Sequence, residues 1–171
     1  MSVVLRVALL VFVASIVQVA AVSGMRLLGA EPDLLLVTIV SVSLLTGSIT
    51  GAVAGFAAGL LVDVMTLGTL GTTSILLTLA GYWAGRYGET TGRGRAYAPP
   101  LAAFAITLFA GIGGVALHFL LGQPVSAHSA LVSALPSAIL AAGLIYVVHP
   151  ISRALLASTQ RFERSRQVEI V

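Results

Sequence analysis

Between Asp33 and Asp63 the chain runs for 29 residues without a charged side chain. Small residues recur at every fourth position in this run, and they are Ser43, Gly47, Gly51, Gly55 and Gly59. A step of four residues turns an α-helix by about 400°, so these residues form one slowly drifting stripe. A stripe of this kind lets a second backbone approach closely, as in GxxxG packing between membrane helices. The pattern predicts a lipid-embedded protein with tightly packed helices.

The composition supports the same class of protein. Of the 171 residues, 58% are hydrophobic and 9% are charged, whereas roughly a quarter are charged in soluble globular domains. A chain of this length suits a single domain and leaves little sequence for a separate soluble module. Function is therefore expected within the membrane or at its two surfaces.

The residue types that the chain lacks exclude several kinds of chemical site. The chain has no cysteine, which excludes disulfides, thiolate metal sites and thiol nucleophiles. It also has no lysine, and all nine basic side chains are arginine. These arginines fall at the predicted helix ends, where the positive-inside rule accounts for them without nucleic-acid binding. We expect no nucleic-acid partner.

The uncharged segments divide into six predicted membrane spans, because a hydrocarbon core of about 30 Å takes about twenty helical residues. The expected helices are about 4–22, 33–45, 49–64, 72–87, 99–121 and 129–148. The second and third are separated at Thr46-Gly47-Ser48, which makes both short for lipid-facing spans. The first is expected to be a retained helix rather than a cleaved signal peptide, because its apolar run is long and its basic start is weak. The fold class is thus all-α and polytopic, with residues 1–149 forming the transmembrane domain.

Arginine placement predicts the orientation. With both termini in the cytoplasm, eight arginines lie inside and only Arg26 lies outside, as the positive-inside rule requires. The inside set is Arg6, Arg86, Arg93, Arg95, Arg153, Arg161, Arg164 and Arg166. Residues 150–171 form a short basic cytoplasmic tail, either an amphipathic surface helix or a plain continuation of the last span.

The charged and polar side chains do not form a recognisable active site. Asp63 lies near the outer end of the third span, where anchoring of the following turn is favoured over proton or ion handling. His118, His128 and His149 are too scattered to bind a metal. Neither a GxSxG elbow nor an HExxH pair is present. We expect a non-enzymatic protein without cofactor or metal.

A second stripe of small residues lies in the sixth span, at Ala130, Ala134, Ala138 and Ala142. Two stripes indicate at least two tight interfaces. One interface could join the third and sixth spans, and another could face a partner protein. The candidate residues for helix packing or partner binding are Gly47, Gly51, Gly55, Gly59, Asp63, Ala134 and Ala138.

The block from Pro32 to Gly88 resembles the rod shape-determining protein MreD family. The elements that carry the resemblance are Pro32-Asp33, Gly47, Gly51, Gly55-Phe56, Gly59-Leu60-Leu61 with Asp63, Leu70-Gly71, and Gly81-Tyr82 with Gly85. Chain length, six spans and a short basic tail also suit that family. The resemblance therefore extends over nearly the whole chain, although glycines and aliphatic residues are less specific than a catalytic motif.

The resemblance implies a non-enzymatic subunit of the bacterial cell-elongation complex in the inner membrane. Its direct partner would be MreC, whose conformation it would regulate, and through MreC it would influence peptidoglycan synthesis and rod cell shape. The indirect partners would be RodA, a penicillin-binding transpeptidase and MreB filaments. The architecture is expected to be similar to that of the S components of energy-coupling-factor transporters.

The alternative is a true S component that binds a vitamin or a metal ion for uptake. S components typically dock their transporter through AxxxA pairs on the first helix. Here Ala8, Ala14, Ala20 and Ala21 are followed four places later by Phe12, Gln18, Gly24 and Met25. The outer half also offers few polar groups for a ligand, namely Asp63, His118, Gln123 and His128. The sequence therefore favours the cell-elongation subunit.

Overall fold

The structure is a computed structural model that describes residues 3–22, 33–67, 69–91, 97–122 and 127–168. These residues form six α-helices and no strand, which confirms the all-α prediction. The helices are α1 (Val3–Val17), continued by the π-helix η1 (Gln18–Val22), then α2 (Leu34–Thr46), α3 (Ser48–Thr66), α4 (Thr72–Thr91), α5 (Ala98–Leu120) and α6 (Ala127–Val168).

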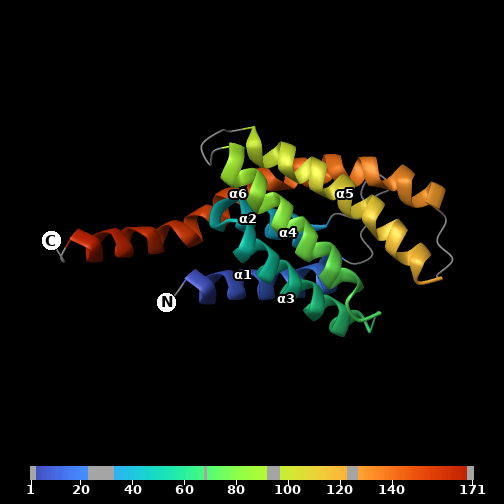
Figure 1. The fold of residues 1–171 in the computed structure, drawn as a ribbon, viewed down its shortest axis with the longest axis horizontal. Helices are drawn as coiled ribbons and strands as arrows, with labels where there is room; N and C mark the ends of the chain where they lie inside the picture. Colours follow the sequence, from blue (N-terminus) through green and yellow to red (C-terminus); the bar gives the residue numbers. More distant parts are fainter. Residues whose placement is uncertain (1–2, 23–32, 68, 92–96, 123–126, 169–171) are drawn as a thin grey trace.

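Successive helices run back and forth between the two ends of the bundle, and the start of α1 lies at the same end as the last turns of α6 (Figure 1). We call this end, where α4 also finishes, the Arg86 end. The opposite end, where α3 finishes and α4 begins, is the Asp63 end. Of the predicted topogenic residues, Arg26, Arg93 and Arg95 lie outside the described residues, as do the side chains of Arg161, Arg164 and Arg166. The cytoplasmic orientation therefore remains a prediction.

Helix α2 is the centre of the bundle. Ten consecutive residues, Leu35–Leu44, are buried, and the helix contacts each of the other five α-helices. Its 13 residues span only about 20 Å, which is less than the hydrocarbon core of a bilayer. The short length is tolerated because α2 is surrounded by protein rather than by lipid.

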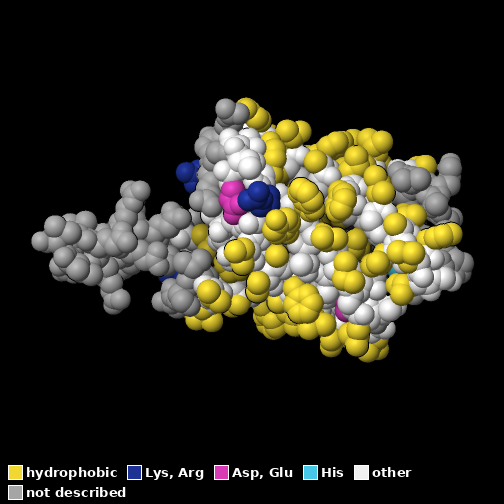
Figure 2. Space-filling model, viewed as in Figure 1, with side chains coloured by type: hydrophobic (Ala, Val, Ile, Leu, Met, Phe, Trp, Pro, Cys, Tyr) yellow, Lys and Arg dark blue, Asp and Glu magenta, His cyan; other side chains and the backbone are white. Residues whose placement is uncertain are grey.

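The outside of the bundle is apolar. Within the described residues, three segments are long and apolar enough to cross a membrane, namely Ser48–Thr66, Ala98–Leu120 and Val132–Leu156, and Val4–Ala20 and Leu34–Thr46 are shorter apolar helices. Hydrophobic side chains are spread over the whole described face seen in Figure 2, where a charged pair lies toward one end. Large apolar side chains such as Ile49, Phe109 and Ile139 are exposed. Such an exterior is stable in lipid but not in water.

The predicted break between the second and third spans is confirmed at Gly47. This residue ends α2 and begins α3, with φ at 104°, a region that L side chains rarely adopt and glycine adopts readily. At the other end of α2, Asp33 is the N-cap, and its Oδ1 accepts the Leu36 N–H at 2.8 Å.

Helix α6 is longer than predicted, because it continues through Pro150 to Val168. The residues after the proline are packed against the rest of the bundle: Ser152 and Leu156 are buried, and Arg6 Nη1 donates to the Leu155 carbonyl at 2.9 Å. These contacts offset the backbone hydrogen bond that a proline removes. The domain boundary expected between residues 149 and 150 falls inside this helix and remains a prediction.

Candidate functional site

The glycine stripe of α3 packs against α4. A Cβ added at Gly51 would lie 2.6 Å from the Gly81 carbonyl oxygen, and a Cβ added at Gly55 would collide with the Leu77 carbonyl. Gly59 faces the Ser74 backbone in the same way. The two backbones therefore meet directly, and glycine is required because nothing larger fits.

The partner of this stripe differs from the pairing considered from the sequence. No contact joins α3 to α6 in the described residues. Helix α4 instead supplies its own small residues, Gly81 and Gly85, which approach Gly51 and Ser48 of α3, while its Gly88 approaches Leu44 of α2. The stripe is consequently covered from within the chain, and its glycines cannot also contact a partner protein.

The predicted residues of α6 lie in a separate contact. Ala134 and Ala138 are buried, and the Ala134 Cβ would be 3.3 Å from a Cβ added at Gly111 of α5. Helices α5 and α6 form one of the two most extensive helix pairs in the bundle. Ala134 thus contributes to the pairing of α5 with α6, while the α3 stripe serves the pairing of α3 with α4.

Asp63 connects the end of α3 to the start of α4. Its side chain is buried, and its Oδ2 accepts the Gly71 N–H at 2.7 Å while its Oδ1 accepts the Thr73 N–H at 3.2 Å. The first N–H groups of a helix have no partner within that helix and favour a negative charge nearby. Asp63 therefore satisfies two donors at the beginning of α4.

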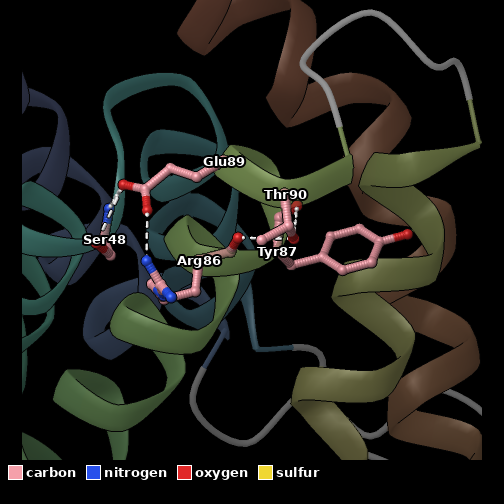
Figure 3. A network of polar contacts seen from close by, with 5 residues as sticks. All are labelled: Ser48, Arg86, Tyr87, Glu89 and Thr90. Carbon is pink, nitrogen blue, oxygen red and sulfur yellow. Dashed lines mark hydrogen bonds and ion pairs between the residues drawn. The ribbon is translucent and has the colours of Figure 1, made fainter.

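A matching contact lies at the other end of the same helix pair, and the sequence did not reveal it. Glu89 Oε1, near the end of α4, accepts both the backbone N–H of Ser48 at 2.8 Å and its hydroxyl at 3.0 Å (Figure 3). Arg86 Nη1 lies 3.5 Å from the second carboxylate oxygen of Glu89. The Ser48 backbone N–H, followed by its hydroxyl, lowers the pKa of the exposed Glu89 carboxyl below its ordinary value. Only the i,i+3 spacing of Arg86 and Glu89 was a local signal for this cluster.

The histidines do not come together. His149 Nδ1 lies 3.1 Å from the Ser41 hydroxyl of α2, whereas His118 lines a cavity toward the Asp63 end. Gln123 and the side chain of His128 lie outside the described residues. Among the described residues, no group of three His, Cys, Asp or Glu side chains is arranged to bind a metal ion.

An apolar groove runs along the outside of the bundle between α1 and α3, with a volume of about 600 Å³. Small residues alternate with large ones along it: Ala8, Ala54 and Ala57 lie among Leu5, Phe12, Ile49, Val53 and Leu61. The groove lies on the face of α3 that α4 does not cover. It is therefore open to a hydrophobic segment from outside the chain.

Comparison with known protein families shows to which family the chain belongs. The rod shape-determining protein MreD family model matches residues 1–159, which is nearly the whole sequence. No curated protein and no solved structure matches the chain, so the likeness to S components remains a prediction. A match of this extent shows that the chain belongs to the MreD family, and its role is in the determination of rod shape.

Proposed function

We propose that this chain is a non-enzymatic membrane subunit of the cell-elongation complex that binds MreC and regulates its conformation. The observation that carries the proposal is the family match over residues 1–159. Through MreC, the chain would regulate peptidoglycan synthesis by RodA and a penicillin-binding transpeptidase, and it would be linked indirectly to MreB filaments. The bundle suits such a role, because its tight internal contacts give a rigid surface on which a second membrane segment can pack.

The groove between α1 and α3 is the surface we assign to MreC. Apart from Thr50, its described lining is apolar, and it lies between two helices with exposed apolar side chains. Its small residues permit the close approach that helix association in membranes requires, where packing rather than water exclusion drives the contact. A single transmembrane helix, as in a one-span protein such as MreC, fits this chemistry. Gly51, Gly55 and Gly59 support the groove indirectly, because they pack α3 against α4 on the side of α3 that faces away from the groove.

Co-purification with MreC tests this assignment. Ala57→Trp fills the groove with a large side chain, and we expect it to reduce the recovered MreC by about tenfold, a loss of about 1.4 kcal/mol of binding free energy. Ile139→Trp is the matched control, since Ile139 is an exposed apolar residue on α6 and lies away from the groove. Equal recovery of MreC with both variants would exclude the groove as the docking surface.

The same proposal places the protein in the inner membrane with both termini in the cytoplasm. The count of eight arginines against one supports this orientation. Because the chain contains no cysteine, single cysteines introduced at Thr90 and at Leu70 can be labelled without background. We expect a membrane-impermeant thiol reagent to label Leu70→Cys, but not Thr90→Cys, from the periplasmic side. The reverse pattern would invert the topology.

A further inference from the structure

A second cavity, of about 540 Å³, lies between α2, α4, α5 and α6 toward the Asp63 end. In contrast to the groove between α1 and α3, it is lined by several polar side chains. These are Asp33, Thr73, Thr107, His118, Ser133 and Ser137, contributed by four different helices. The remaining wall is apolar and includes Leu36, Leu76 and Val115. Convergent polar groups in a largely apolar cavity are the usual composition of a small-molecule site.

Thr107 is the first indication that the polar groups serve a ligand. Its side chain is only 6% exposed, and its hydroxyl has no hydrogen-bond partner among the described residues. In contrast, Thr38, Thr46 and Thr66 each donate to the carbonyl four residues earlier in their own helix. A buried hydroxyl without a partner costs about 1–3 kcal/mol. Thr107 is one of the residues that line the cavity, so a ligand bound there can supply the missing hydrogen-bond partner.

Asp33 is the one acidic side chain in the described lining of the cavity. One of its oxygens caps α2 through the Leu36 N–H, and no arginine of the described residues forms an ion pair with this carboxylate. The described lining includes neither lysine nor arginine, so it provides no partner for a carboxylate or phosphate ligand. A carboxylate removed from water is stabilised by a nearby cation. With only Asp33 and His118 as metal-binding side chain types in the lining, an organic cation suits the site better than a metal ion.

We propose that this cavity binds a small organic amine. The ammonium group lies against the Asp33 carboxylate and donates to the Thr107 hydroxyl, while an apolar portion contacts Leu76 and Val115. This ligand goes beyond MreC binding, which we assign to the separate groove between α1 and α3. A free amine and the amine headgroup of a phospholipid share this chemistry.

Binding of n-hexylamine to the full-length protein tests the proposal. The protein is placed in nanodiscs of phosphatidylglycerol, which carry no amine, and binding is measured by calorimetry against protein-free discs. n-Hexanol and hexanoate match the apolar part and replace only the head group. We expect saturable binding of n-hexylamine and none of the other two. Equal binding of n-hexanol or of hexanoate would overturn the proposal, as would the absence of n-hexylamine binding.

Two variants locate the bound amine. Asp33→Asn keeps an oxygen that can cap α2 but removes the charge, and we expect it to weaken n-hexylamine binding by about tenfold, equal to about 1.4 kcal/mol. Thr107→Val preserves the shape of the side chain and should weaken binding by a smaller factor. Thr46→Val is the control, because Thr46 lies at the other end of α2. Unchanged binding in both Asp33→Asn and Thr107→Val would place the amine elsewhere and refute the site.

A final comparison distinguishes the two sources of the amine. Adding phosphatidylethanolamine to the nanodiscs should weaken n-hexylamine binding competitively if a lipid headgroup is the natural ligand. Unchanged affinity would identify a free amine as the ligand, and both results retain the amine site. MreC recovery is measured in parallel with Asp33→Asn, so that loss of amine binding with normal MreC recovery separates this site from the function proposed above.

Discussion

The α3–α4 pair and the α5–α6 pair both rely on small residues, yet these residues do different things in the two places. In α3 and α4, Gly51, Gly55 and Gly81 bring the backbones so close that an added Cβ would collide with a carbonyl group. In α5, a Cβ at Gly114 would lie 3.7 Å from Leu76, which is ordinary contact, and a Cβ at Gly143 of α6 would meet nothing within 4 Å. Small residues thus bring two backbones into direct contact in the α3–α4 pair, whereas Gly111 of α5 approaches only a side chain, that of Ala134 in α6, at 3.3 Å.

The comparison shows that a small-residue pattern specifies a face without specifying its neighbour. Of the α3 glycines, Gly51 meets Gly81 of α4, whereas Gly55 and Gly59 meet the backbone at Leu77 and Ser74. In α5, Gly111 and Gly114 line the cavity that also contains Thr107, so removal of side chains creates volume. We call α3–α4 the tight pair, because its backbones are in contact, and α5–α6 the open pair, because it borders the cavity. The tight pair provides rigidity, and the open pair provides room for a ligand.

Substitution of Gly55 should have the largest effect on stability. We expect Gly55→Ala to lower the free energy of unfolding by about 3 kcal/mol, because overpacking forces the two backbones apart, and Gly55→Leu to prevent recovery of folded protein. Detergent unfolding of the purified variants measures the loss. Gly143→Ala, in open space, is the matched control and should not destabilise. Equal stability of Gly55→Ala and the wild type would show that the backbones of α3 and α4 are not in direct contact at Gly55.

Removal of the Asp63 carboxylate should have the next largest effect, because it leaves the Gly71 and Thr73 N–H groups without their acceptor. We expect Asp63→Ala to cost about 2 kcal/mol, the range for losing buried hydrogen bonds to a charged group. Thr66→Val changes an exposed residue in the last turn of α3 and should change stability little. If the two variants melt at the same temperature, the carboxylate does not stabilise the tight pair.

The sequence was sufficient to predict the six helices, most of them within two or three residues at each end. Gly47 and Pro99 mark helix boundaries that can be predicted from the sequence, because glycine tolerates a positive φ and proline is favoured in the first turn of a helix. The burial of α2 was not predictable, because its apolar residues and its hydroxyl residues are spread around the helix and mark no side that faces lipid. The pairing of α3 with α4 depends on contacts between residues far apart in the sequence. Gly55 and Leu77 are 22 positions apart, and Ser48 and Glu89 are 41 positions apart, which no local pattern specifies.

Substitution in the open pair should have a smaller effect of the opposite sign. Gly114→Ala adds a methyl group where ordinary contact is available and reduces the freedom of the unfolded chain, so we expect a gain of about 0.5–1 kcal/mol. The same change should reduce the room for n-hexylamine in the cavity. Unfolding and calorimetry on one preparation measure both quantities. A loss of stability as large as that of Gly55→Ala would remove the distinction between the two pairs.

The smallest effect is expected at the Arg86 end of the tight pair, where Glu89 contacts the start of α3. Because the Glu89 pKa is lowered in the folded protein, its carboxylate stabilises the fold above the ordinary carboxyl pKa, and this contribution is lost as the pH falls through the folded value. Wild type should therefore melt slightly above Glu89→Gln at neutral pH, and the two should converge in acid. Thr90→Val, one residue away and uncharged, should keep a constant difference from wild type across the same range. If the melting temperature of Glu89→Gln also differed from that of wild type by the same amount at every pH, the amide would replace the carboxylate fully. Hydrogen bonding to Ser48, rather than the charge of Glu89, would then join the two helices at this end.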